Sequence, residues 1–157
     1  MKITLLLTGK TEIQPLKDVM AEYIKRIVHY TNFEVIETPD IKNIKNLSVE
    51  QYKQKEAEIQ KKHLARSDFI ILLDEFGKEY TSEKFAQFLE HKIQIGIKNP
   101  MFVVGGAYGF SEEIKKMSQA QISLSQMTFP HQLVRLIFIE QLYRAFTIIR
   151  KEKYHHS

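Results

Sequence analysis

The side chains best suited to chemistry lie in the last third of the chain. His131 follows Pro130 at the start of a long apolar-patterned segment, which we expect to be helical. In the first turn of a helix the dipole favours a neutral imidazole, which can accept a proton or a hydrogen bond. A structural histidine held by a hydrogen bond is the alternative interpretation of this position.

Three charges interrupt the same apolar segment, namely Arg135, Glu140 and Arg144. Charged side chains are seldom buried unless they are paired. These three therefore either pair within or between chains, or face an anionic substrate.

The chain ends in a short tail that contains Tyr154 and His155. Tyrosine and histidine together can stack on a nucleobase and handle a proton. A frayed terminus is the simpler interpretation of such a tail. The residues alone leave both interpretations open.

A scaffold for these residues is predicted by the apolar pattern. Short apolar runs predict strands buried on both faces, and apolar residues at helical spacing predict helices. Strands that alternate with helices indicate an α/β fold with a parallel-rich sheet flanked by helices. The expected strands are 1–8, 33–36, 69–73, 101–104 and 121–124, and the expected helices are 15–30, 48–64, 82–95, a short one after Ser111, and 130–151.

Two of these elements carry a more detailed expectation. Helix 48–64 is rich in Lys, Glu and Gln, so we expect it to be exposed, with Ser48 as its N-cap. The strand 69–73 is expected to end at the polar and glycine-containing segment 74–77.

The carboxyl ends of parallel strands meet at one edge of a sheet, so Leu73, Gly105 and Leu124 are expected to share a crevice. The segment 105–109, GGAYG, lacks the spacing of a dinucleotide-binding loop, and the helix after it opens with Glu112 and Glu113. Negative charge there disfavours a pyrophosphate. The crevice therefore suits a ligand without phosphate, while a plain glycine turn remains the alternative.

The terminal helix, 130–151, is apolar around most of its circumference. A helix of this kind is buried on more than one side. A homodimer packed through this helix is one explanation, and deep burial within the chain is the other.

Composition limits the classes of protein that need to be considered. The 157 residues are 43% hydrophobic, which suits a single domain, 1–157. The chain has no cysteine, which excludes disulfides, thiolate nucleophiles and cysteine-based zinc sites. No apolar run has the length of a signal or a membrane span, so we expect a cytoplasmic protein that uses neither membrane nor metal. A net charge of +4 is compatible with a polyanionic partner.

Several segments together carry a resemblance to a known family. They are the N-terminal strand ending in Gly9-Lys10, FIILLDEFGK, VVGGAYG, SLSQMTFPHQLVR, IEQLYRAF and the terminal YHH. In this order and over the whole chain they resemble the ribosomal RNA large subunit methyltransferase H family. These are small SPOUT-class enzymes that methylate N3 of a pseudouridine in 23S ribosomal RNA.

The resemblance implies an α/β domain with a C-terminal trefoil knot, S-adenosyl-L-methionine as cofactor and a homodimer as the active unit. It also implies that residues 152–157 form a tail on the substrate side. The residues implied for cofactor binding are Leu73, Gly105, Leu124, Ser125, Gln126, Met127, Thr128 and Phe129. Those implied for the substrate side and catalysis are His131, Arg135, Glu140, Arg144, Tyr154 and His155.

In the implied reaction the enzyme positions the RNA base and removes its N3 proton. Arg135 or Arg144 would hold phosphate or stabilise the base anion, and His155 or His131 would accept the proton. The small basic surface favours folded ribosomes or large subunits as substrate. Alternatives are a SPOUT methyltransferase for another RNA, a non-catalytic ribosome-binding factor and, more distantly, a nucleotide-dependent oxidoreductase.

Overall fold

A computed structural model of the chain describes residues 1–156. Five strands form one sheet in the order β2-β1-β4-β3-β5, and every neighbouring pair is parallel. The parallel α/β fold predicted from the apolar pattern is therefore confirmed. The strands are β1 (Lys2–Leu7), β2 (Asn32–Glu37), β3 (Phe69–Glu79), β4 (Pro100–Val104) and β5 (Ala120–Ser123).

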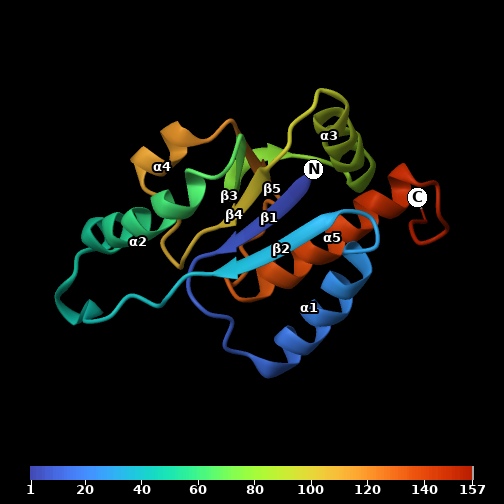
Figure 1. The fold of residues 1–157 in the computed structure, drawn as a ribbon. Coiled ribbons are helices and arrows are strands. Elements are labelled where there is room, and N and C mark those ends of the chain that lie inside the picture. The colour runs from blue at the N-terminus through green and yellow to red at the C-terminus, as the bar shows by residue number, and fades with distance from the viewer. Residues whose placement is uncertain (157) are drawn as a thin grey trace.

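Helices cover both faces of the sheet and give three layers (Figure 1). Their bounds are α1 (Gln14–Ile27), α2 (Val49–Leu64), α3 (Ser82–Gln94), α4 (Glu112–Met117) and α5 (Leu133–Ile149), with a 3-10 turn, η1, at Ile44–Asn46. Side chains alternate along the strands, as pleating requires. In β1, Leu5 and Leu7 pack with α1, α3 and α5, whereas Leu6 packs on the opposite face with α2 and α4.

The terminal helix α5 packs against α1 and α3 on one face of the sheet. Its residues Phe138, Ile139 and Leu142 are fully buried within the single chain. Intrachain packing therefore accounts for much of its apolar circumference, while the homodimer stays a prediction. The trefoil knot also stays a prediction.

The start of α5 differs from the sequence-based expectation. The helix begins at Leu133, three residues after Pro130. The segment from Pro130 to Gln132 forms a turn, in which the Pro130 carbonyl accepts hydrogen bonds from the amides of Leu133 and Val134, at 3.0 and 3.1 Å. His131 thus precedes the helix instead of lying in its first turn.

Strand β3 is longer than predicted, because 74–77 interrupts its pairing without ending it. Leu73 and Lys78 both align with Ile122 of β5, so the intervening residues form a bulge. Gly77 allows β3 to come close to β5 again, so that pairing resumes at Lys78. A Cβ at this position would lie only 2.6 Å from the carbonyl carbon of Gln121.

Helix α2 has the predicted N-cap but is less exposed than predicted. Ser48 and Gln51 form a reciprocal capping box. One face of the helix buries Glu56 and Gln60, and the Gln60 amide donates to Thr8 Oγ1 at 2.8 Å. A pattern of Lys, Glu and Gln cannot reveal this face, since the polar partners lie elsewhere in the chain.

Candidate active site

A large cavity opens at the carboxyl edge of the sheet, as expected for a parallel α/β fold. Its volume is about 720 Å³, within the range of small-molecule sites. Three segments near the carboxyl ends of strands form most of its wall. They are 73–76 in the β3 bulge, 104–110 after β4 and 124–131 after β5.

Seven of the eight predicted cofactor residues line this cavity. Gln126 is the exception, since it is exposed and absent from the wall. The seven that the structure brings together are Leu73, Gly105, Leu124, Ser125, Met127, Thr128 and Phe129.

Local hydrogen bonds fix the loop after β5. Ser123 Oγ donates to the Ser125 carbonyl at 2.8 Å, and Ser125 Oγ accepts from the Met127 amide at 2.9 Å. Thr128 Oγ1 donates to Glu75 Oε2 at 3.0 Å, which ties this loop to the β3 bulge. Polar side chains in this segment thus shape the cavity wall.

The sequence reasoning missed several wall residues. The wall residues that contribute charge or an aromatic ring and were not among the predicted site residues are Asp74, Glu75, Phe76, Tyr108, Phe110, Lys53 and Lys115. Asp74 directly follows a predicted strand end and Tyr108 lies in the glycine segment, so position relative to the strands could have found both. Lys53 comes from α2, and no local signal connects it to this site.

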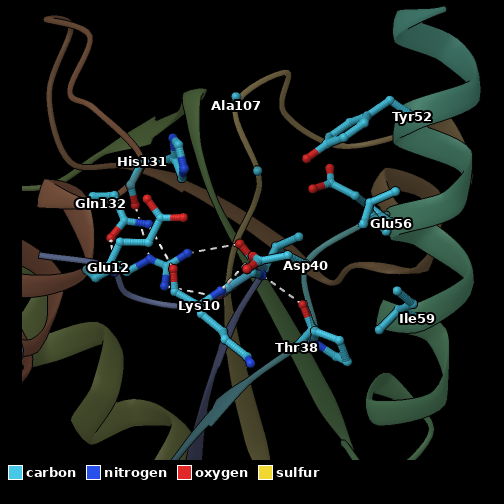
Figure 2. A pocket seen from close by; sticks show the side chains of 16 residues that line it. Lys10, Glu12, Thr38, Asp40, Tyr52, Glu56, Ile59, Ala107, His131 and Gln132 are labelled. Atoms are coloured by element: carbon cyan, nitrogen blue, oxygen red, sulfur yellow. Dashed lines mark hydrogen bonds between the residues drawn. The ribbon is translucent and has the colours of Figure 1, made fainter. Parts of the chain in front are cut away.

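A second, smaller cavity of about 100 Å³ adjoins the first (Figure 2). Gly106, Ala107 and His131 line both cavities. Figure 2 shows Tyr52 and Glu56 projecting from α2 toward the loop that carries Ala107.

Glu56 is 4% exposed, and its Oε1 has no hydrogen-bond partner within residues 1–156. Burial raises the pKa of Glu56 from 4.5 to about 7, although a hydrogen bond from Tyr52 lowers it in part. Near neutral pH this carboxyl group is therefore present in both its neutral and its ionised form.

Arg135 is fully buried at the start of α5. Its guanidinium donates to the carbonyls of Thr8 and Gly9, both at 2.9 Å, and to Thr11 Oγ1 at 2.8 Å. Its Nε donates to the His131 carbonyl at 3.2 Å. Burial lowers the pKa of Arg135, and nearby carboxylates led by Glu37 act in the opposite direction. The guanidinium joins the end of β1 to α5 and turns inward, away from solvent.

The other four predicted substrate-side residues form a separate cluster. Arg144 binds Glu140 through Nε and Nη2, at 3.0 and 2.6 Å, and its guanidinium lies 4.7 Å from the centre of the Tyr154 ring. The Tyr154 hydroxyl donates to Glu140 Oε1 at 3.1 Å. Burial, then hydrogen bonding with Tyr23 and the charge of Glu140, raise the pKa of Tyr154. The tail therefore folds back on its own chain.

Two neighbours determine the tautomer of His155. Arg144 Nη1 lies 3.1 Å from Nδ1, and Glu83 Oε1 lies 2.8 Å from Nε2. Arginine can only donate, so Nδ1 is the acceptor and Nε2 carries the hydrogen that Glu83 accepts. This hydrogen bond from His155 lowers the pKa of Glu83. The contact with Arg144 thus occupies the Nδ1 lone pair of His155.

The six predicted residues thus fall into two groups along α5. Arg135 and Arg144 are nine positions apart, about 13 Å along a helix. Of the six, only His131 lines the large cavity.

Comparison with known proteins decides the family. The profile described as a predicted SPOUT methyltransferase matches residues 1–155. The ribosomal RNA large subunit methyltransferase H of Parabacteroides distasonis is 52% identical over 157 residues and covers all of both chains. The protein of the same name from Flavobacterium johnsoniae is 51% identical, again with full coverage of both. The chain belongs to this family of SPOUT methyltransferases.

Two solved structures of methyltransferases share this fold. The tRNA (m1G37) methyltransferase from Aquifex aeolicus aligns with a TM-score of 0.55 at 15% identity, over 100% of this chain and 76% of that chain. A probable methyltransferase from Bordetella pertussis Tohama I aligns with a TM-score of 0.56 at 9% identity, over 92% and 96%. At these identities the likeness shows the fold alone.

Two features are absent from the described part of the chain. Within residues 1–156 no helix is long and apolar enough to cross a membrane. The same residues contain no group of three or more His, Asp or Glu side chains that could hold a metal ion.

Proposed function

We propose that the chain is an S-adenosyl-L-methionine-dependent methyltransferase that acts on N3 of a pseudouridine in 23S ribosomal RNA, within assembled ribosomes or large subunits. The observation that carries this proposal is the full-length identity of about 50% to proteins named ribosomal RNA large subunit methyltransferase H. The cavity formed by the three strand-end segments supports it. The enzyme would work in the cytoplasm, where its substrate is.

The walls of the large cavity suit this cofactor. Leu73, Leu124 and Phe129 offer apolar surface for an adenine ring, and Asp74 and Glu75 offer carboxylates for an ammonium and a sulfonium group. Gly105 allows the Phe110 ring to pack against the backbone of the cavity wall, since a Cβ there would lie 3.2 Å from this ring. The bound cofactor supplies an electrophilic methyl group.

The substrate side requires residues that the large cavity of one chain lacks. Glu140, Arg144, Tyr154 and His155 are absent from its wall. We therefore propose a homodimer in which the tail cluster of one chain approaches the cofactor cavity of the other. Such an arrangement would give the tail a role in the reaction. A frayed terminus would have no such role.

In this arrangement the chain's own residues manage the base and its proton. Arg144 is better placed than Arg135 to hold phosphate or stabilise the base anion, since 24% of its side chain is exposed whereas Arg135 is buried. When Arg144 turns toward the RNA, it frees Nδ1 of His155 to accept the N3 proton. Arg135 keeps the turn that carries His131 in place.

Methyl transfer from labelled cofactor to intact ribosomes, followed by mapping of the modified nucleoside, tests this function. We expect one labelled nucleoside, N3-methylpseudouridine, in 23S ribosomal RNA. Label in transfer RNA or at another base would assign a different RNA substrate. Failure to bind S-adenosyl-L-methionine in calorimetry would instead favour a non-catalytic ribosome-binding factor.

A further inference from the structure

Glu56 is a buried carboxylate for which the proposed function has no task. It lines the smaller cavity, is 4% exposed, and has an oxygen, Oε1, without a hydrogen-bond partner among residues 1–156. Burying an unpaired polar oxygen costs free energy. A donor group on a ligand would remove this cost.

The position of Glu56 relative to the cofactor cavity is fixed by close packing. Its carboxylate lies directly against Gly106, where a Cβ would overlap Oε2. Gly106 lines both cavities, as do Ala107 and His131. A ligand group that contacts Glu56 is therefore separated from the large cavity by Gly106.

The smaller cavity suits the edge of a flat ring. Its volume of about 100 Å³ is below the roughly 150 Å³ that accommodates benzene in an engineered apolar cavity. Tyr52 lines it beside Glu56, and the Tyr52 ring meets the Tyr108 ring edge-to-face at 5.4 Å. Aromatic surface next to a buried acceptor matches a nucleobase that presents an N–H group.

Pseudouridine differs from uridine in this feature. Its base is attached to ribose through carbon, which leaves N1–H free as a donor, whereas uridine has C–H at the corresponding edge. N1 and N3 flank the same carbonyl group and point away from each other. A base that directs N3 into the cofactor cavity can thus direct N1–H into the smaller cavity.

We propose that Glu56 determines specificity, by accepting a hydrogen bond from N1–H of the target pseudouridine that uridine cannot donate. This inference rests on the proposed function. A site built around a buried hydrogen-bonding group rejects a substrate without the matching group, because the buried group is then left unpaired. A pKa of about 7 is compatible with this role, since the neutral and the ionised carboxyl group both keep an acceptor oxygen.

Two substitutions of similar size test the role of the acceptor. Glu56→Gln keeps an acceptor oxygen, and Glu56→Met removes it. Glu58→Met, an exposed position on the same helix, is the matched control. The measurement is kcat/KM on ribosomes with pseudouridine at the target position, and on ribosomes with uridine there, prepared from a strain without the corresponding pseudouridine synthase.

We expect wild type, Glu56→Gln and Glu58→Met to prefer pseudouridine. Glu56→Met should lower this preference about ten- to hundredfold, through a slower reaction with pseudouridine and a reaction with uridine that is no slower than that of wild type. Its affinity for S-adenosyl-L-methionine in calorimetry should equal that of wild type.

A Glu56→Met enzyme that keeps the wild-type preference would overturn the inference and leave the proposed function intact. Equal losses on both substrates, or loss of cofactor binding, would also overturn it, because Glu56 would then only support the glycine loop. A wild-type enzyme that methylates neither substrate would instead refute the proposed function on which the inference rests.

Discussion

Replacing Glu56 by glutamine should change how the stability of the protein depends on pH. The folded protein holds this carboxyl group in a buried site that raises its pKa from 4.5 to about 7. The folded state therefore binds more protons than the unfolded state between these two values. Wild type should lose stability as pH rises through this window, whereas the neutral glutamine removes that contribution.

The size of the effect follows from the shift. At 1.36 kcal/mol per pKa unit, a rise from 4.5 to about 7 corresponds to about 3 kcal/mol. Solvent in the adjoining cavity screens part of this, so we expect about 2 kcal/mol between pH 5 and pH 8. Other ionisable groups line the same cavity and are common to both proteins, namely Lys10, Glu12, Asp40, Tyr52, His131 and Arg135.

Urea unfolding of both proteins at pH 5, 6, 7 and 8 measures this difference. Glu58→Gln is the control, because a hydrogen bond from Lys61 lowers the pKa of Glu58 and gives a weak trend of opposite sign. If the free energies of unfolding of wild type and Glu56→Gln differ by the same amount at every pH, the assignment of a buried, titrating carboxyl group is wrong.

Two further substitutions and one deletion have defined outcomes. Arg135→Met leaves the carbonyls of Thr8 and Gly9 without their donor and should lower the free energy of unfolding in urea by about 3 kcal/mol. A loss below about 1 kcal/mol would contradict the view that Arg135 tethers the end of β1 to α5. Gly106→Ala should weaken cofactor binding in calorimetry, because the added Cβ meets the Glu56 carboxylate. A second substitution in the same chain, Glu56→Ala, should restore cofactor binding. If the double variant still binds the cofactor weakly, the contact with Glu56 is not the cause. Removing residues 154–157 should abolish ribosome methylation and keep cofactor binding. Unchanged turnover would exclude a role of the tail in the reaction. Of these four residues, Ser157 lies outside the described residues.

The layers of the fold could be predicted because each strand carries its own signal. Apolar runs such as 69–73 are short, continuous and bounded by polar residues, so local sequence identifies them. The order of strands is a different matter. β4 lies between β1 and β3, and this placement depends on packing between segments far apart in the chain.

The candidate site was predictable to the extent that it follows the strand ends. Gly105 and Leu124 directly follow β4 and β5, and Leu73 is the last residue of β3 before its bulge, which brings all three to one edge of the sheet. The burial of Glu56 could not be predicted, because Glu58 on the same helix looks alike in sequence and is exposed. What separates the two is Gly106, fifty residues away along the chain, which lies directly against the Glu56 carboxylate.

The tether made by Arg135 bears on how the chain is completed during synthesis. Its partners on Thr8 and Gly9 precede it by 127 and 126 positions. The ribosome makes β1 first. The carbonyls at its carboxyl end lack their donor until Arg135 has been translated. Contacts over such separations make folding slow and cooperative across the domain. Nascent chains that end before α5 should thus resemble unfolded protein in protease sensitivity, even though all five strands are already made.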